Sequence, residues 1–293
     1  MFYKVTLTGA FVGLAALSAS SAWAEMLDVD GGQIYYETVG EGMPIMVMHG
    51  GLGLDSTYLR PYFDQLSDLG QVIYLDHRGN GRSSRPDDYS SITMETMIDD
   101  AEALRQHLGG QPMVLIGHSW GGFIAQEYAI KYQDNLAGLV LVDTVPVFDY
   151  APTLSGTEEQ MAALGELFSR PTTDDEDMRS LWNTVIPMYF QQGSPELFAR
   201  LDAATTYSAN AWNNAGGILA NFNTLDDLPN VQTKTLAVAG AHDGITPYKP
   251  GALRIFSIMP NADVTLFYGS GHYPFIEEEE EFFSYLRNWI SGL

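Results

Sequence analysis

The sequence predicts an α/β fold in which helices flank a mostly parallel sheet and a helical segment is inserted between two strands. Short apolar runs recur along the chain, and they are continuous rather than alternating, as is typical of strands buried on both faces. Helical patterns separate most of these runs, and such an alternation predicts parallel strands covered on both sides. The alternation stops between residues 146 and 232, where helical patterns continue without a buried strand.

Each strand is expected where an apolar run lies. Gly31 and Gly32 suit a hairpin turn into a strand at 33–39. One helix is expected at 93–108, where apolar residues recur at helical spacing, and another at 122–132. The later strand runs, in chain order, are 45–49, 72–76, 113–117, 139–143, 235–239 and 264–268.

The stretch without a strand pattern is an expected helical cap, rich in aromatic residues that either line a pocket or form the cap's own core. Its helical patterns lie at 157–168, 174–190 and 195–207. Acidic runs at 174–177 and 277–281 are expected at helix N-termini, where carboxylates meet the positive end of the helix dipole. The chain is thus divided into a signal segment at 1–24, a core made of 25–145 and 233–293, and a cap at 146–232.

The N-terminal residues have the pattern of a secretory signal peptide. Lys4 is followed by an apolar stretch and then by Ala22-Trp23-Ala24, a small-residue cleavage pattern. The apolar stretch is shorter than the roughly 20 residues that a membrane-spanning helix needs. We therefore expect cleavage near Ala24, export to the periplasm or the medium, and no stable membrane insertion of a mature chain that begins at Glu25.

Composition excludes several kinds of chemistry. The chain has no cysteine, so disulfides, thiolate nucleophiles and cysteine-ligated metals are excluded. No two histidines have the helical spacing of a metal-ligand pair, and we expect neither a metal nor another cofactor. The net charge of −23 repels nucleic acid and anionic lipid, so neither is an expected partner.

A candidate nucleophile lies between an expected strand and an expected helix. Residues 117–121 read Gly-His-Ser-Trp-Gly, the G-x-S-x-G pattern of a tight strand-to-helix turn. Glycines without a Cβ let the strand and the helix approach, which lifts the serine above the sheet. The N-terminal end of the following helix favours a negative charge at the same place. Ser119 is therefore the candidate nucleophile.

A serine hydroxyl needs a base, which is usually a histidine held by a carboxylate. His272 lies in the loop after the last expected strand, and Asp243 lies in the loop after the strand before it. Both loops follow the carboxyl ends of parallel strands, where open α/β sheets place their sites. We therefore expect a triad of Ser119, Asp243 and His272. Asp143, at the end of an earlier strand, is the competing acid, and His242 is interpreted as a loop residue beside Asp243.

Two backbone N–H donors are needed for the oxyanion that forms during acyl transfer. One is expected from Trp120, the residue after the nucleophile. The other is expected from the glycine-rich loop that starts at His49, with Gly51 favoured and Gly50 second. His49 itself and the polar stretch at 76–84 are interpreted as braces that hold loops by hydrogen bonds.

Together, these motifs resemble the α/β-hydrolase superfamily. The resemblance implies an α/β-hydrolase fold, a Ser–His–Asp triad and a helical cap. It covers most of the chain after the signal segment and uses motifs in their usual order. The motifs are His-Gly-Gly-Leu-Gly-Leu-Asp at 49–55, Asp-His-Arg-Gly-Asn-Gly-Arg-Ser at 76–83, Gly-His-Ser-Trp-Gly-Gly at 117–122, and the loops with Asp243 and His272.

Two branches of that superfamily are similar to this chain. The His-Gly-Gly-x-Gly loop and the tryptophan after the nucleophile are similar to the prolyl aminopeptidase-like branch. The resemblance implies that cap glutamates would hold the substrate's amine. The Gly-His-Ser-x-Gly-Gly form is shared with esterases and lactonases. The candidate glutamates are Glu158, Glu159, Glu166, Glu176 and Glu196.

The expected function is that of a serine hydrolase that cleaves a small carboxylic ester or lactone through an acyl-enzyme. Its expected partner is a small-molecule substrate. Removal of an N-terminal proline from peptides is the alternative. A second alternative, from another functional class, is a ligand-binding protein that keeps the hydrolase fold without turnover.

Overall fold

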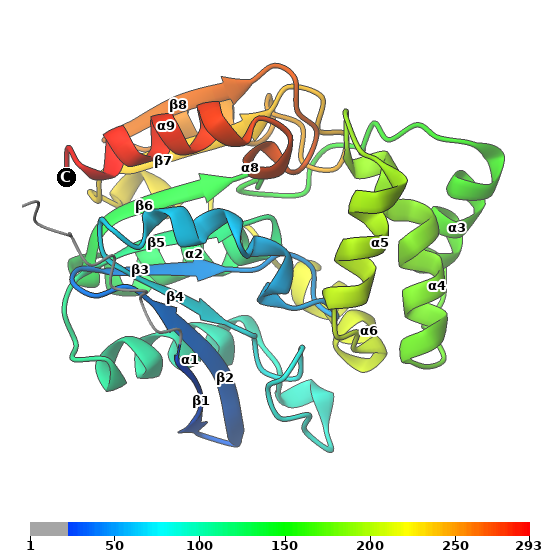
Figure 1. Cartoon of the computed structure of the whole chain (residues 1–293), viewed down its shortest axis with the longest axis horizontal. Helices are drawn as coiled ribbons and strands as arrows, with labels where there is room; N and C mark the ends of the chain where they lie inside the picture. Colours follow the sequence, from blue (N-terminus) through cyan, green and yellow to red (C-terminus); the bar gives the residue numbers. More distant parts are fainter. Residues whose placement is uncertain (1–22) are drawn as a thin grey trace, which may run out of the picture.

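The structure, a computed structural model, describes residues 23–293. An eight-stranded sheet runs through its centre in the order β1-β2-β4-β3-β5-β6-β7-β8 (Figure 1). The pairs β1–β2 and β2–β4 are antiparallel, and all other neighbours are parallel. The predicted α/β fold with a mostly parallel sheet is confirmed. The strands are β1 (Trp23–Val29), β2 (Gly32–Val39), β3 (Pro44–Met48), β4 (Gln71–Leu75), β5 (Met113–His118), β6 (Leu136–Val142), β7 (Thr235–Gly240) and β8 (Ala262–Phe267).

Helices cover both faces of this sheet. Alternate side chains of β3 enter two separate buried clusters, because successive residues of a strand point to opposite faces. The 3-10 helix η2 and helix α9 close the first cluster, and α1, α2 and α7 close the second. The bounds are η2 (Tyr62–Leu66), α1 (Met94–His107), α2 (Trp120–Tyr132), α7 (Ala252–Ile258), α8 (Pro274–Glu277) and α9 (Glu279–Ile290).

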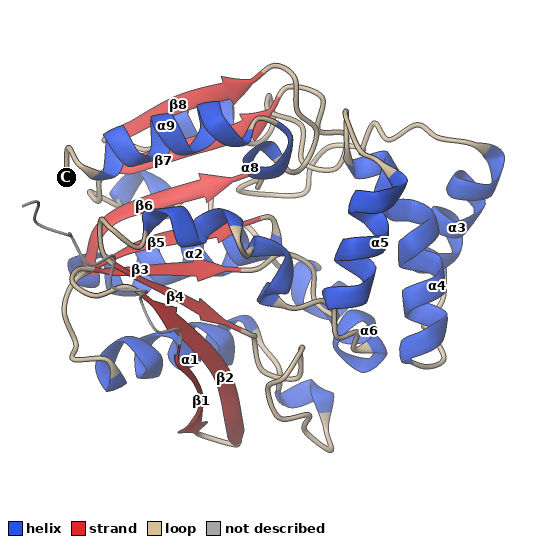
Figure 2. Ribbon diagram, viewed as in Figure 1, coloured by secondary structure: helices blue, strands red, loops and turns tan. Residues whose placement is uncertain are grey.

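The segment between β6 and β7 forms a group of helices beyond the carboxyl ends of the parallel strands (Figure 2). Asp174 is the N-cap of α4, in agreement with the acidic run there. Helix α6 has no counterpart among the predicted helices, because its asparagines and its Gly216 and Gly217 are weak helix formers. The bounds are α3 (Glu158–Ser169), α4 (Asp175–Val185), α5 (Pro195–Ala204) and α6 (Ala209–Leu219).

The glutamates of the run near the C-terminus have two structural roles. Helix α9 begins at Glu279, so only the later part of the run opens that helix as predicted. Glu277, at the end of α8, instead accepts the N–H groups of Gln191 and Gln192 over 2.7 and 2.6 Å. This glutamate therefore ties the core to the loop between α4 and α5.

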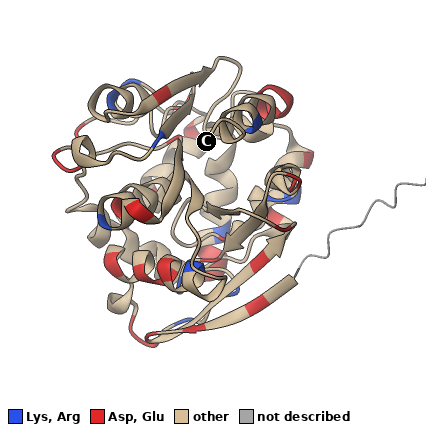
Figure 3. Cartoon of the chain, turned by 90° about the vertical axis from the view of Figure 1, so that its left-hand side faces the viewer, with Lys and Arg blue, Asp and Glu red and all other residues tan. Residues whose placement is uncertain are grey.

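The predicted signal segment lies outside the described residues except for Trp23 and Ala24. These two residues belong to β1, where they pair with Thr38 and Glu37. Within residues 23–293, none of the helices has the length and apolar character needed to cross a membrane. Acidic residues are spread over helices and loops among fewer basic ones (Figure 3), as the net charge of −23 requires.

Candidate active site

Ser119 lies on a strained turn between β5 and α2. Its backbone has φ 53° and ψ −114°, a combination that residues with a side chain rarely adopt. A Cβ on Gly117 would meet the backbone of Gly121, and a Cβ on Gly121 would meet the carbonyl oxygen of Met48. Both positions therefore need glycine, and the close approach of strand and helix places Ser119 at the carboxyl edge of the sheet.

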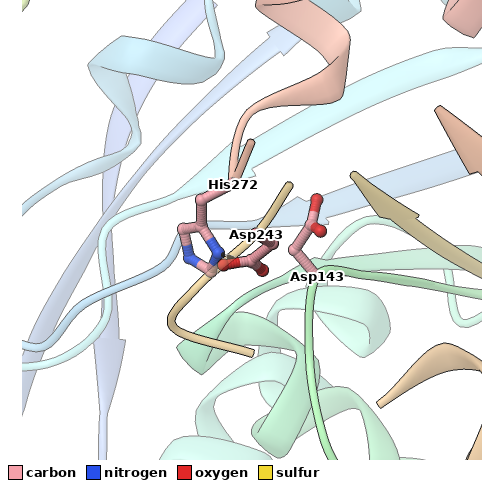
Figure 4. Close-up of side chains that lie close together, drawn as sticks. All are labelled: Asp143, Asp243 and His272. Carbon is pink, nitrogen blue, oxygen red and sulfur yellow. Dashed lines mark hydrogen bonds and ion pairs between the residues drawn. The ribbon is translucent and has the colours of Figure 1, made fainter. Parts of the chain in front are cut away.

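Asp243 follows β7, His272 follows β8, and the fold brings their side chains together (Figure 4). Nδ1 of His272 donates to Oδ2 of Asp243 over 2.8 Å, and both side chains are almost fully buried. The same carboxylate accepts hydrogen bonds from the hydroxyl of Thr246 at 2.6 Å and from the N–H of Ile245 at 2.8 Å.

These partners decide the charge state of Asp243. Burial alone would raise the pKa of its carboxyl, but the charge and hydrogen bond of His272, with those of Thr246 and Ile245, lower the pKa to about 2. Asp243 is therefore ionised at neutral pH. Its carboxylate fixes the proton of the imidazole on Nδ1 of His272, which leaves Nε2 able to accept a proton.

The loop that carries His272 is held by the cap as well as by the core. The N–H of His272 donates to the carbonyl oxygen of Tyr189, in the cap, over 2.7 Å. The N–H of Gly271 donates to Glu277 over 2.7 Å, and the same glutamate binds the cap loop. Sequence reasoning missed this attachment, for which the glutamate run just after the histidine was the available signal.

Ser119 and His272 line the same cavity. The side-chain hydrogen bonds of His272 run from Nδ1 to Asp243 and, at 3.4 Å, to Thr246. Among the described residues, none joins Nε2 to the hydroxyl of Ser119. Catalytic hydrogen bonds are often long without substrate and shorten when it binds. The structure thus gathers the three candidate triad residues, with Asp243 and His272 already joined.

The candidate oxyanion donors differ in what their N–H groups contact. Trp120 is the first residue of α2, so its N–H has no acceptor within the helix. The N–H of Gly50 donates to the hydroxyl of Tyr58 over 2.6 Å. The N–H of Gly51, which also lines the cavity, has no acceptor among the residues that the structure describes. The geometry therefore favours Trp120 and Gly51, and it gives Gly50 a supporting place.

His118, just before the nucleophile, is a buried histidine to which sequence reasoning assigned no role. Its Nδ1 accepts the hydroxyl of Tyr58 at 2.6 Å, and its Nε2 donates to the carbonyl oxygen of His272 at 2.8 Å. Burial lowers the pKa of His118 well below its usual value, so the ring is neutral. Together with the bond from Gly50 to Tyr58, these hydrogen bonds connect the glycine-rich loop at 49–53 to the loop that carries His272.

The polar stretch after β4 braces buried loops, in agreement with its interpretation from the sequence. Asp76 accepts hydrogen bonds from the N–H of Ser56 and from the guanidinium of Arg82. His49 accepts the N–H of His77 at 3.1 Å. These side chains hold the glycine-rich loop in place rather than face the cavity, whose lining residues include none of them.

The cavity above Ser119 has a volume of about 360 Å³ and is mostly apolar. None of its described lining residues is an aspartate or a glutamate, and the one charged side chain among them is Arg170. That guanidinium is already paired with Glu166 and Asp177. A bound molecule therefore meets aromatic and aliphatic groups and no unpaired carboxylate. The larger apolar and aromatic lining side chains are Leu52, Leu54, Tyr58, Trp120, Phe123, Phe148, Leu167, Phe168, Trp182, Tyr189, Trp212, Leu219, Ile245 and Tyr273.

One group of described side chains is close enough to share a cation. The potential ligand atoms of Asp143, Asp243 and His272 lie within 4.8 Å of one another. Nδ1 of His272 carries the proton that it donates to Asp243, and a protonated ring nitrogen has no lone pair for a metal. We therefore interpret the group as an orienting arrangement for the histidine.

Comparison with known proteins agrees with the observed fold. Residues 44–279 match the model of the alpha/beta hydrolase fold family. A proline iminopeptidase from Lactobacillus helveticus is 29% identical over 286 residues, which cover 89% of this chain and 95% of the relative. An esterase from Exiguobacterium antarcticum has a similar structure, with a TM-score of 0.75, 25% identity, and coverage of 90% of this chain and 97% of the esterase. The enol-lactonase from Burkholderia xenovorans LB400 shares the fold, with a TM-score of 0.75, 19% identity, and coverage of 91% and 100%.

The family match includes the sheet from β3 onward, the turn with Ser119, and both loops that carry Asp243 and His272. The relative from Lactobacillus helveticus is named as a proline iminopeptidase, and the structural neighbour from Exiguobacterium antarcticum is named as an esterase. The chain therefore belongs to the α/β-hydrolase fold family and is a hydrolase.

Proposed function

We propose that this hydrolase is a serine esterase or lactonase that works through an acyl-enzyme. Nε2 of His272 removes the proton of Ser119 as the hydroxyl attacks the substrate carbonyl, and then protonates the leaving oxygen. Asp243 orients His272 and stabilises the imidazolium. The N–H groups of Gly51 and Trp120 hold the oxyanion. Water, activated by the same histidine, then releases the acid and restores Ser119.

The lining of the cavity is the observation that carries the choice of substrate. The cavity is mostly apolar, and no unpaired carboxylate lines its described wall. A neutral ester or lactone can enter such a site without losing strong interactions with water. A free amine is a cation at neutral pH, and its desolvation without a partner is costly. The cavity therefore favours an ester or lactone over a peptide with a free N-terminus.

The alternative, an N-terminal proline exopeptidase, is supported by relatives named as proline iminopeptidases and by the tryptophan after the nucleophile. It needs a carboxylate near the substrate's amine. Glu166 is paired with Arg170, and Glu176 is paired with Arg179. The described lining of the cavity includes none of the candidate glutamates, which are Glu158, Glu159, Glu166, Glu176 and Glu196.

We expect the purified mature protein to prefer esters or lactones over proline p-nitroanilide. The panel consists of p-nitrophenyl esters of increasing acyl length, homoserine lactones and the anilide. The expected kcat/KM for the best ester or lactone exceeds that for the anilide by at least ~100-fold, because the amine is left unpaired.

Esters are intrinsically more reactive than anilides, so a matched pair isolates the amine. The p-nitrophenyl esters of proline and of cyclopentanecarboxylic acid share a five-membered ring and a leaving group. The carbocyclic ester is expected to be the better substrate. If kcat/KM is higher for the proline ester than for the carbocyclic ester, and higher for the anilide than for the esters and lactones of the panel, the exopeptidase alternative replaces the esterase proposal. Parallel assays of Ser119→Ala subtract hydrolysis that occurs elsewhere.

We also propose that the protein is exported, which the pattern of residues 1–24 supports. Cleavage after Ala24 shortens β1 by two residues and leaves the pairing of Glu25 with Tyr36 and all later pairs. The intact mass of the protein from the periplasm or medium is expected to correspond to a chain that starts at Glu25. Ala24→Tyr removes the small residue that cleavage needs, so this variant is expected to keep the precursor mass. Wild-type protein that keeps Met1 would contradict export by this route.

A further inference from the structure

Asp143 is a buried carboxyl that the proposed mechanism does not use. It directly follows β6 and is 0% exposed. Its φ of 46° lies in the left-handed region, which a residue with a side chain seldom adopts. Figure 4 shows its side chain beside those of Asp243 and His272. From the sequence, Asp143 and Asp243 are alternative candidates for the acid of the triad. The fold places both carboxyls next to the same histidine.

The two oxygens of Asp143 differ in their surroundings. Oδ1 accepts the N–H of Gly240, the last residue of β7, over 2.8 Å. Oδ2 is buried and has no hydrogen-bond partner among the described residues. A Cβ on Gly240 would meet the carbonyl oxygen of Gly271, so the loops of Asp243 and His272 come together at this point. Asp143 thus lies where both loops are anchored.

An ionised Asp143 would put two negative charges side by side in a buried place. Burial first, and the charge of Asp243 second, raise the pKa of Asp143 well above its usual value. The charge of Glu277 adds repulsion, and the Asp243 carboxylate already accepts the Nδ1 proton of His272. When Asp143 is protonated, Oδ2 can become a donor. A carboxylate oxygen of Asp243 lies within 4.8 Å of one of Asp143, so Asp243 is the acceptor that we infer for it.

We propose that Asp143 is a positioning residue which, as a neutral acid, donates a hydrogen bond from Oδ2 to the Asp243 carboxylate and holds it against His272. The two carboxyls then carry one negative charge between them, as close carboxyl pairs do. The proton stays on Asp143 throughout the reaction. The catalytic consequence rests on the proposed triad, whereas the protonation of Asp143 does not.

Infrared difference spectroscopy of the wild type against Asp143→Asn tests the protonation without any substrate. At neutral pH the wild type is expected to show the carbonyl stretch of a protonated carboxylic acid, and the variant is expected to lack it. If the variant instead loses carboxylate bands that the wild type shows, Asp143 is ionised and the proposal is overturned. Because the measurement needs no turnover, its outcome is independent of whether the protein is an esterase.

Kinetics of two variants test the positioning. Asp143→Asn keeps an N–H donor and an oxygen acceptor, so kcat/KM is expected to stay within about threefold of the wild type. Asp143→Leu removes both, and it is expected to lower kcat by ~10- to 100-fold with little change in KM, since a small misplacement of catalytic groups has effects of this size. Wild-type kcat in a folded Asp143→Leu would contradict the proposal.

The pH dependence separates positioning from a general structural effect. The acid limb of the kcat/KM profile reports protonation of the base. With a neutral Asp143, Asp143→Asn removes no charge, and the acid limb is expected to stay in place. A shift to lower pH would mean that a negative charge beside His272 was lost, which would overturn the proposal. Asp100→Asn removes another buried aspartate, which lies on α1 and pairs with Arg78, and is the control for lost stability. If Asp143→Leu fails to fold, Asp143→Asn still decides.

Discussion

Ser119→Ala is expected to abolish covalent labelling by a fluorophosphonate probe and to lower kcat by ~10⁴-fold or more, given the size of nucleophile deletions. The probe reacts only with a hydroxyl that a neighbouring base activates. Alanine has the same Cβ as serine, so the strain of the turn with φ 53° is unchanged and the variant is expected to fold. Intact mass after labelling measures the first effect, and the ester assay measures the second.

A second serine of the same cavity provides the matched control. Ser169, at the end of α3, lines the cavity on the side of the cap. Ser169→Ala is expected to be labelled like the wild type. No labelling of the wild type, or equal labelling of Ser119→Ala, would favour the ligand-binding protein without turnover. The test therefore separates an enzyme from a binding protein before any substrate is known.

The strands could be predicted from the sequence because a strand covered on both faces must be apolar at nearly every position. All residues of β3 and β5 are buried, and both were visible as continuous runs. Helix α6 could not be predicted in this way. Its glycines and asparagines oppose helix formation, and packing of the buried Ala209 and Ala211 in the cap outweighs that local preference.

The same contrast applies to the site. Ser119, Asp243 and His272 each follow a strand and lie within a short local pattern, so the sequence could place all three at one edge of the sheet. The link from Tyr58 through His118 to the backbone of His272 could not be predicted, because it joins residues that are far apart in the chain. Such contacts depend on how loops fold over one another, which no local pattern records.

Asp143 shows a second limit of sequence reasoning. Two aspartates that follow neighbouring strands look like alternatives when each is judged by its own motif. The parallel pairing of β6 with β7 brings both strand ends together, so both carboxyls reach the same histidine. Their roles are then set by their partners. Asp243 accepts hydrogen bonds from several donors and is ionised. Asp143 accepts one hydrogen bond, and the negative charge of Asp243 beside it opposes its ionisation.

His272→Ala is expected to lower kcat by at least ~10³-fold with a much smaller change in KM. The ionised Asp243 keeps the proton on Nδ1 of His272, so Nε2 is the nitrogen that can take the proton of Ser119. Removal of the ring leaves Ser119 without a base, while the cavity wall that binds the acyl group is largely kept. Steady-state kinetics with the best ester of the panel would measure the two constants separately.

His242→Ala is the matched control, because this histidine adjoins Asp243 in the sequence. The N–H of His242 donates to the carbonyl oxygen of Ser270, and its side chain is absent from the described lining of the cavity. Its loss is therefore expected to leave kcat within about threefold of the wild type. An inactive His242→Ala together with an active His272→Ala would assign the base to the other loop. Loss of activity in His272→Ala but not in His242→Ala would assign the base to the loop of His272. Tyr189 and Glu277 hold the backbone of this loop.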